Sequence, residues 1–412
     1  LYAATQPLGV LKVPTGQGVR GQSVALSRTS LWAGEPHGDA FQRAFASRPL
    51  MTLDAGGAPF LRPMAGLAEA LHAHTASARA YDALVAPRLA WHYHQPNGVR
   101  LSLSAPSSNG EGDDASASSA AYLASVPLPD GRGRMVSGYG VHAALGFAPS
   151  ASRNMLPHMT ELFLPAWPGF ARGMHVGAET KTWQILGFQD DDAYAHVADH
   201  PDAARASLAG FMAGVRTPWS LGRAQGGTNW QVGFVRENGA RQSSLGHGAL
   251  RLAGAHDTWF FGASSSLALA GGWHGMASGY VGITDASASG EESLVRDLGR
   301  MVSSQFALAL VRPHLWRTHD QLSLYLAQPL RVESGRAALL LPTRRTPAGQ
   351  IVQERYEFDL APSGRSVEWG LQYRQHAFAG ELALGAALVH EPGHRRDAEP
   401  EARLLLSWQY RF

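Results

Sequence analysis

The sequence predicts an all-β protein in which residues 206–412 form a transmembrane antiparallel β-barrel of about twelve strands. Three observations point to this fold. Charged residues make up only 17% of the 412 positions, and 46 glycines with 24 prolines supply many turns, as in strand-rich chains. Short segments that alternate between apolar and polar residues recur from residue 206 onward. The last of these segments ends on an aromatic residue, Phe412.

Residues 17–205 have a different pattern, which indicates a mixed linker or junction region with short helices. Phe41–Ala46 and Met64–Leu84 have apolar residues at helical spacing. Pro63 stands directly before the second of these segments, where the first turn of a helix tolerates proline. We therefore expect two helices ahead of the barrel.

A hairpin and a loop are expected later in the same region. Residues 89–93 and 99–103 alternate and are joined through Pro96-Asn97-Gly98, a sequence typical of turns. Residues 107–121 are mainly Ser, Gly, Asp and Ala, which have little power to form a core, so a flexible loop is predicted. Residues 135–147 and 174–188 have the pattern of further strands, so the sequence does not fix which strand is the first of the barrel.

Twelve alternating segments are expected to build the barrel. In one of them, Val367, Trp369 and Leu371 share a face, opposite Glu368 and Gly370. A tilted strand of about 9–11 residues crosses the hydrocarbon of a bilayer, and bacterial single-chain barrels use an even number of strands. Tryptophans near the strand ends fit the aromatic belts of a membrane interface. The expected strands are residues 206–217, 227–236, 243–252, 257–269, 272–284, 298–312, 320–331, 334–343, 351–361, 364–376, 378–390 and 402–412.

The C-terminal segment favours a membrane barrel over a soluble all-β domain. Its alternate apolar residues point to one side, and a long exposed strand of this kind would promote aggregation in water. A barrel that closes in lipid has no free edge. A soluble β-sandwich alternates in the same way and stays the alternative fold. The predicted barrel-assembly signal consists of Leu404, Leu406, Trp408, Tyr410 and Phe412.

Seven charged residues are expected to face the interior of the barrel, where polar side chains are tolerated. One interpretation is that they grip a segment that passes through the pore and seal it. The simpler alternative is that water in the interior solvates them. These residues are Glu357, Asp359, Glu368, Arg374, Glu381, Arg403 and Arg411.

Composition argues against several kinds of chemistry. The net charge of +2, with 35 scattered basic residues, does not make the basic surface that nucleic acid binding needs. The chain has no cysteine, which excludes disulfides, zinc–thiolate sites and thiol nucleophiles. No Gly-x-Ser-x-Gly turn is present, and His92 with His94 is better explained as the polar face of a strand than as a metal site. We therefore predict no catalytic residue, no metal and no cofactor.

Short stretches in a fixed order carry a family resemblance. They are Leu1-Tyr2-Ala3-Ala4 with Pro7-Leu8-Gly9, Ser23-Val24-Ala25-Leu26, Leu53-Asp54-Ala55 to Pro59-Phe60, Trp230 to Gly239, Leu245-Gly246, Gly248-Ala249, Gln328-Pro329-Leu330-Arg331 and Leu360-Ala361-Pro362-Ser363-Gly364-Arg365. Together they resemble the C-terminal translocator of autotransporters, in the group whose secreted passenger is a subtilisin-like serine protease. The resemblance covers most of the chain and rests on the order of the stretches and the terminal strand. It assigns residues 1–16 to the end of a passenger domain.

The resemblance implies a twelve-stranded barrel in the bacterial outer membrane, surrounded by lipid and lipopolysaccharide and folded by the barrel-assembly machinery. The segment ahead of the barrel would pass through the pore to a passenger at the cell surface. A subtilisin-like site needs Asp, His and a Ser in a Gly-Thr-Ser-Met-type stretch, and that stretch is missing. The chain is thus expected to export or display a passenger without being an enzyme itself.

Two other functions stay open. One is an outer-membrane porin or channel, although a porin spends few residues before its first strand. The other is a barrel hydrolase that uses exposed histidines at the outer rim, namely His256, His274, His314 and His319. Because Leu1 is not preceded by a Met or a signal peptide, the chain is expected to be a fragment of a longer precursor.

Overall fold

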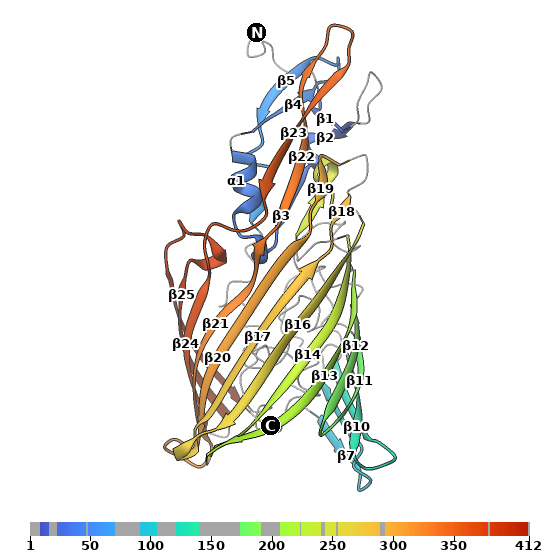
Figure 1. The fold of residues 1–412 in the computed structure, drawn as a ribbon. Coiled ribbons are helices and arrows are strands. Elements are labelled where there is room, and N and C mark those ends of the chain that lie inside the picture. The colour runs from blue at the N-terminus through green and yellow to red at the C-terminus, as the bar shows by residue number, and fades with distance from the viewer. Residues whose placement is uncertain are drawn as a thin grey trace.

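A computed structural model gives the arrangement of most of the chain (Figure 1). It describes residues 9–15, 23–46, 48–70, 91–104, 121–139, 174–190, 207–222, 224–239, 244–252, 254–288, 293–377 and 380–410. In this described part the secondary structure is almost all strand, with a single α-helix. The all-β class predicted from the sequence is therefore confirmed.

The largest unit is one sheet of fifteen strands, in which every neighbouring pair runs antiparallel. β13 and β14, for example, pair from Ser207 opposite Asn238 to Leu221 opposite Ala224. From one edge to the other the strands are β26 (Glu401–Tyr410), β25 (Gly380–His390), β24 (Val367–Ala377), β21 (Asp320–Ser334), β20 (Met301–Pro313), β17 (His274–Thr284), β16 (Ala255–Ala268), β14 (Ala224–Asn238), β13 (Ser207–Leu221), β12 (Trp183–Asp190), β11 (Met174–Thr180), β10 (Gly133–Tyr139), β9 (Ala121–Pro127), β8 (Arg100–Ser104) and β7 (Trp91–His94). Among the described residues no pairing joins β7 to β26, so the sheet is not closed there.

The membership of the sheet differs from the twelve predicted strands. Nine of its strands come from predicted segments, and six more, β7 to β12, come from residues before 206. The predicted strands 243–252, 334–343 and 351–361 lie outside this sheet. Their apolar side chains, such as Leu250 and Leu339, are fully buried in a separate core. Residues 351–361 alternate like the strands of the sheet, and residues 337–342 form a continuous apolar run that does not by itself show where a strand is buried, which is why the prediction placed them in the sheet.

A second unit, which we call the head, stands at one end of the large sheet (Figure 1). It combines described residues between 9 and 70 with three insertions between strands of the large sheet, at 244–252, 287–300 and 335–360. Its helices are α1 (Ala40–Ala46) and the short 3₁₀ turns η1 (Leu26–Arg28), η2 (Glu35–His37) and η4 (Gly248–Leu250). Its strands are β1 (Lys12–Pro14), β2 (Ser23–Ala25), β3 (Ser30–Ala33), β4 (Pro49–Leu53), β5 (Pro59–Pro63), β6 (Ala68–Ala70), β15 (Leu245–His247), β18 (Ser287–Ala288), β19 (Val295–Leu298), β22 (Arg336–Arg345) and β23 (Ile351–Asp359).

These strands form three small sheets around one hydrophobic core. The sheets have the orders β2-β1-β4-β5, β15-β3-β6 and β18-β19-β22-β23. The core draws on both parts of the chain, because Phe41 and Leu50 from the N-terminal part pack with Leu250, Leu294 and Leu339 from the insertions. The N-terminal part therefore completes a core to which the insertions contribute much of the apolar surface.

The predictions for residues 41–103 are confirmed in part. α1 covers the first predicted helix, and β7 and β8 form the predicted hairpin, with Trp91 opposite Leu103. The second predicted helix is wrong for residues 64–70, where β6 pairs in parallel with β3. The reason is the head core, because Met64 is completely buried in it and Ala68 lies opposite Leu31. Residues 71–84 and the predicted loop 107–121 lie largely or wholly outside the described residues.

The two ends of the sheet are unequal. At the end away from the head, which we call the turn end, β13 to β26 are joined by short connections such as 222–223, 269–273 with η5 (Ala270–Gly272), and 314–319. At the head end the connections are the three insertions of the head and residues 391–400, with η6 (Pro392–His394). The last described strand runs toward the turn end (Figure 1). No helix in the described residues is long and apolar enough to span a membrane.

Candidate functional site

The large sheet exposes apolar side chains on one side, and the side that it buries carries many polar residues beside apolar ones such as Leu186, Met212 and Phe260. We call its two sides the apolar face and the polar face. Exposed residues of the apolar face include Met135, Ile185, Phe211, Val215, Trp230, Val232, Trp259, Phe261, Val281, Ile283, Leu308, Leu310, Leu324, Trp369, Leu371, Leu384 and Leu388. Buried polar residues of the opposite face include His175, Gln184, Gln231, Thr258, Ser264, Ser278, Ser303, Gln305, Ser323 and Gln372. This is the reverse of a strand packed in a water-soluble core, which hides its apolar side.

The apolar face has a sharp border at the head end. Phe211, Phe234 and Trp259 lie side by side on three neighbouring strands, with ring centroids 6.0 Å and 5.0 Å apart along the row. Two residues further along β14, Arg236 pairs with Asp257, with Nε and Oδ1 2.7 Å apart. Asp285 and Arg300, which lie just beyond the head ends of β17 and β20, form a longer pair, with a nitrogen–oxygen distance of 3.6 Å. A belt of charges therefore begins directly beyond the aromatic row.

Aromatic side chains also mark the border at the turn end. Trp316 in the β20–β21 turn is 72% exposed and lies 5.2 Å from the ring of Tyr373. The guanidinium of Arg312 stacks over the ring of Trp273 at 5.6 Å. Trp219 donates a hydrogen bond from its indole nitrogen to Thr228, at 2.9 Å. The apolar face thus has aromatic residues at both borders, as an interfacial belt requires.

On the polar face, large rings of one strand cover glycines of the next. A Cβ added at Gly262 would lie 2.2 Å from the ring of Tyr280, and one at Gly370 would lie 2.0 Å from the ring of Tyr325. Tyr280 on β17 donates a hydrogen bond across β16 to the side-chain oxygen of Gln231 on β14. These glycines therefore provide the space in which the rings lie flat against the sheet.

An ion cluster on the polar face was not anticipated from the sequence. Glu179 on β11 accepts hydrogen bonds from Arg134 on β10, at 2.6 Å, and from Arg216 on β13, at 3.0 Å. The Glu179 side chain is only 8% exposed, so the two arginines neutralise a buried carboxylate. No local motif signals this cluster, because its members are brought together by the registers of β10, β11, β12 and β13.

Three of the seven charges predicted for the interior have side chains on the polar face. Glu368 accepts a hydrogen bond from the Tyr325 hydroxyl at 2.5 Å, and Arg374 lies on the same side of β24 as Glu368. Arg403 pairs with Glu401, a neighbour on that face of β26 that the prediction omitted. For Glu381 only the backbone is described, opposite Gln409, and Arg411 lies outside the described residues.

The remaining two of these charges, Glu357 and Asp359, are corrected by the structure. They lie on β23, which pairs with β22 in the head and not with any strand of the large sheet. Phe358 between them packs against the head core. Glu357 consequently projects to the head surface, where it pairs with Arg355 at 3.5 Å.

Three of the predicted assembly residues have described side chains, and all three lie on the apolar face of the terminal strand. Leu404 is 79% exposed, Leu406 is 67% exposed and Trp408 is 52% exposed. The backbone of Tyr410 pairs with Gly380, at the start of β25. Phe412 lies outside the described residues.

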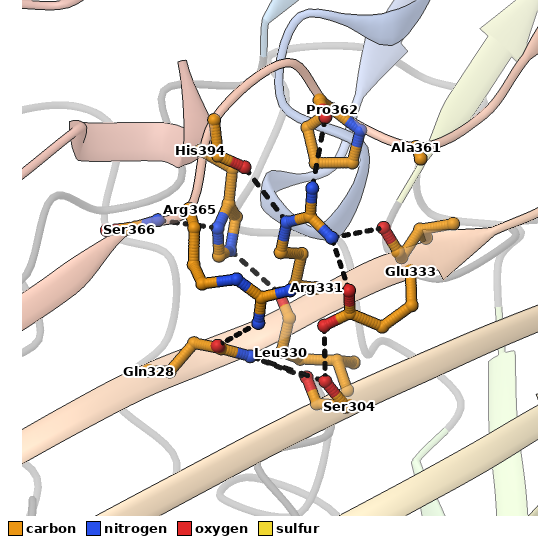
Figure 2. Close-up of polar contacts among 12 residues, drawn as sticks. Ser304, Gln328, Leu330, Arg331, Glu333, Ala361, Pro362, Arg365, Ser366 and His394 are labelled. Atoms are coloured by element: carbon orange, nitrogen blue, oxygen red, sulfur yellow. Dashed lines mark hydrogen bonds and ion pairs between the residues drawn. The ribbon is translucent and has the colours of Figure 1, made fainter. Parts of the chain in front are cut away.

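Where the sheet meets the head, a cluster of polar side chains forms what we call the junction (Figure 2). Its centre is Glu333, whose two carboxylate oxygens accept hydrogen bonds from Ser304 at 2.5 Å, from Arg331 at 2.5 Å and from Arg365 at 2.6 Å. Burial by itself raises the pKa of Glu333, but the hydrogen bonds from Arg365 and Ser304 and the positive charge of the arginines lower it further, so the pKa lies below its ordinary value. The carboxylate is therefore held ionised.

The two arginines also bind backbone and amide oxygens. Arg331 donates to the carbonyl of Gly364 at 2.9 Å and to that of Pro362 at 3.1 Å. Arg365 donates to the side-chain oxygen of Gln328. The junction consequently ties the end of β21 to the segment 361–366 that precedes β24.

His394 forms the third connection of the junction (Figure 2). Its ring is completely buried. The amide of Ser366 donates to its Nδ1 at 2.9 Å, and its Nε2 lies 3.1 Å from the carbonyl oxygen of Leu330. Nδ1 is thus the acceptor and Nε2 the donor, which is the neutral form of the ring with both nitrogens bonded.

The junction brings together stretches that are distant in the sequence. Gln328-Pro329-Leu330-Arg331 and Leu360 to Arg365 are the two late stretches on which the family resemblance rests, and the structure joins them through Arg331 and Arg365. Both stretches stand out in the sequence, but their contact does not. His394, Glu333 and Ser304 were missed, because nothing in their local sequence separates them from other strand or turn residues.

The histidines considered for a rim hydrolase do not converge. His256 is buried, contrary to its predicted exposure, and lies near the head end of β16, opposite Glu237. His274 pairs with Ala268 at the turn end, where His314 and His319 also lie. In the described residues no three side chains of His, Asp or Glu gather as metal ligands would.

Comparison of the chain with family models, with curated proteins and with solved structures found no match.

Proposed function

We propose that the chain is an outer-membrane β-barrel that serves as the translocator and anchor of an autotransporter. The observation that carries the proposal is the exposed apolar face of the large sheet, opposite a buried side on which many polar side chains lie. The patch of exposed Leu, Ile, Val, Phe and Trp extends across neighbouring strands, whereas monomeric soluble proteins rarely expose a contiguous patch of more than a few hundred Å². Lipid is the solvent that matches such a face.

The borders of the apolar face also favour contact with lipid. From β13 to β20 the described charged side chains of this face, Arg236, Asp257, Asp285, Arg300 and Arg312, lie at or beyond the aromatic borders. Placing a Lys or Arg at the middle of a bilayer on the outside of a barrel costs about 2–4 kcal/mol. A strand surface free of charges between two aromatic borders avoids that cost.

In the proposal the sheet closes into a barrel in the membrane, because an open edge in lipid leaves backbone groups without partners. The fifteen strands alternate in direction, so β7 and β26 run the same way. An antiparallel closure needs an even number of strands, and bacterial barrels use one. The proposed membrane location therefore does not depend on the predicted count of twelve strands.

The unequal ends of the sheet set the orientation. Barrels of the outer membrane have short turns toward the periplasm and longer loops toward the outside. By this rule the head, and with it the N-terminal part of the chain, faces outward. A polypeptide attached ahead of residue 9 would then begin at the cell surface, which is where an exported or displayed passenger belongs.

The identity of the passenger is proposed from the family resemblance alone. A subtilisin-like protease is the passenger that the resemblance implies, and the chain would carry it without supplying catalytic residues. Its partners would be outer-membrane lipid, lipopolysaccharide and the barrel-assembly machinery, with Leu404, Leu406, Trp408, Tyr410 and Phe412 as the assembly signal.

The first test is electrophoretic migration with and without boiling. Purified protein in detergent should migrate faster before boiling if the sheet is a closed barrel, and removal of Phe412 should reduce that form. Leu61→Ala is the matched control, since Leu61 is 49% exposed on the head, away from the sheet. Identical migration before and after boiling, with protein that stays soluble without detergent, would refute the barrel and favour a secreted all-β protein.

A second test separates a translocator from a porin. Because the chain has no cysteine, single cysteines at Val10, which is 59% exposed, and Trp316, which is 72% exposed, give unique labels at the two ends. A membrane-impermeant maleimide should label intact cells at position 10 and not at position 316. A reporter domain fused ahead of Leu1 should also reach the surface; surface labelling at position 10 without display of the reporter would favour a channel.

A further inference from the structure

The ladder between β21 and β24 stops halfway along the sheet. The two strands pair from Asp320 opposite Gln375 to Ala327 opposite Glu368. β21 continues beside β20 to Ser334, whereas β24 begins only at Val367. At the head end the backbone pairing between these strands is therefore replaced by the side chains of the junction. The strands beyond this break, β24, β25 and β26, form one edge of the sheet.

The segment that begins with η2 holds the chain on the far side of this break. Residues 35–46, which comprise η2 and α1 and which we call the latch, come from the N-terminal part of the chain. The Asp39 carboxylate accepts a hydrogen bond from the amide of Ser363 at 2.8 Å, and Arg43 donates to the carbonyl of Ala361 at 2.6 Å. Asp39 and Arg43 also pair with each other, at 3.2 Å. The latch thus binds the same segment, 361–366, that the junction ties to β21.

Gly38 brings the latch against the loop between the last two strands. It has a φ of +47°, and a Cβ at this position would lie 2.7 Å from the carbonyl oxygen of Gly393 and 2.8 Å from the Cβ of Pro362. Only glycine allows the three segments to approach so closely. η2 and η6 are therefore in direct contact.

The loop that receives the latch is held in an unusual conformation. Glu391, Gly393 and His394 all have positive φ, at 49°, 63° and 55°. For Glu391 and His394 this is a conformation that persists only when the surroundings impose it. The surroundings are the contact with Gly38 and the two hydrogen bonds of His394 to Ser366 and Leu330. The β25–β26 loop is therefore held jointly by the latch and by β21.

We propose that docking of residues 35–46 clamps the β24–β26 edge of the sheet to β21. The contact between β21 and β24, which we call the seam, is then tight only when the N-terminal segment has docked at the head end. The biological role of this clamp rests on the proposed function. In a translocator the segment ahead of the barrel must reach the head end before it can dock, so the clamp couples completed passage to closure of the seam. The contacts themselves do not depend on membrane insertion.

The experiment is hydrogen–deuterium exchange on the full chain in detergent, with Gly38→Val as the main variant. A valine at this position collides with backbone and proline atoms that cannot turn away. Amides at the head end of β24 to β26 should exchange about tenfold faster or more, because the contacts that hold the loop are lost. Amides of β4 and β22 in the head and of β13 and β14 in the sheet should keep their protection.

Two further variants keep the result interpretable. Gly66→Val is the matched control, because Gly66 lies in the head with nothing within 4 Å of an added Cβ, and its exchange should equal that of the native chain. Asp39→Ala removes the acceptor of the Ser363 amide without adding bulk, and should loosen the same strands if Gly38→Val gives no folded protein.

Two exchange results would overturn the clamp. Faster exchange of the 361–366 amides together with unchanged β24 to β26 would overturn the clamp, since the latch would then be released without effect on the seam. Loss of protection throughout the head and sheet in both Gly38→Val and Asp39→Ala would also overturn it, because residues 35–46 would then support the whole fold. Failure of the proposed function would appear elsewhere, as a native chain whose migration does not change on boiling.

Discussion

The large sheet and the head both contain leucine-rich strands, but the head buries these leucines and the large sheet exposes them. In the head, Leu339 on β22 is 1% exposed, whereas Leu308 on β20 is 45% exposed. Leu339 packs in a core with Phe41 and Leu294, and Leu308 lies on the apolar face beside Leu326 of β21. The comparison teaches that alternation alone does not say which solvent a strand meets. Under the proposed function, water surrounds the head and lipid surrounds the sheet.

The largest expected difference between the two regions comes from Leu339→Ala compared with Leu308→Ala. Truncation in the head core removes buried apolar surface and leaves a cavity, which destabilises by about 2–5 kcal/mol. Truncation on the apolar face leaves no cavity, and its effect should be much smaller. Urea unfolding of the detergent-solubilised chain, followed by exchange of β4 and β22 amides, measures the loss in the head. Equal losses for the two variants would contradict the assignment of the solvents.

The next largest effect is expected for Leu308→Arg. A charge near the middle of the apolar face should destabilise the sheet in lipid by about 2–4 kcal/mol, and Val302→Arg, near the head-end border, by about 0–1 kcal/mol. The fraction that migrates as the compact form after refolding into lipid vesicles reports the difference. If both arginines are tolerated equally, this face is not in lipid.

A smaller effect is expected for Gly262→Ala on the polar face. The added Cβ would lie 2.2 Å from the ring of Tyr280, and overpacking of this kind costs about 1–3 kcal/mol. Gly279→Ala on the neighbouring strand is the matched control, because nothing lies within 4 Å of its Cβ position. Thermal loss of the compact form in detergent should come earlier for the first variant only. An equal midpoint for both would show that Tyr280 can move aside.

The smallest effect concerns the pH dependence of the junction. Because the pKa of Glu333 is lower in the folded chain than in an unfolded one, ionised Glu333 stabilises the fold above the unfolded pKa, and this contribution disappears as the pH falls through the folded pKa. Protection of the 361–366 amides should therefore be constant near neutral pH and decline in acid. Glu333→Gln should lower protection at neutral pH and flatten this decline, and an unchanged acid profile would assign the titration to another group.

Much of the sheet could be predicted because its strands are long and regular. β13, β14, β16, β17 and β24 were each anticipated within a few residues, since apolar residues recur at alternate positions over much of each strand. β23 alternates in the same way and β22 carries the apolar run 337–342, and the core formed with residues 9–70 receives both of them in the head. That choice depends on contacts between distant segments, which a local pattern does not contain.

The candidate site shows the same limit in finer detail. Alternation correctly groups Glu368, Arg374 and Arg403 on one face of their strands, and that this face is the interior of a barrel stays a prediction. Glu357 and Asp359 followed the same rule into the wrong sheet. The Arg134–Glu179–Arg216 cluster depends on the registers of four strands. Arg331 and Arg365 were noticed for their sequence context, but their contacts depend on where the ladder between β21 and β24 stops.

The central claim, that the apolar face of the sheet meets lipid, is tested most directly by spin labels on single cysteines in this cysteine-free chain. Val281→Cys and Leu308→Cys place a label on the apolar face, and Ser278→Cys places one on the polar face. In lipid vesicles the first two labels should be accessible to oxygen and shielded from a water-soluble nickel complex, and the third should not share this lipid signature. Labels at 281 and 308 that are freely accessible to the nickel complex would contradict the claim.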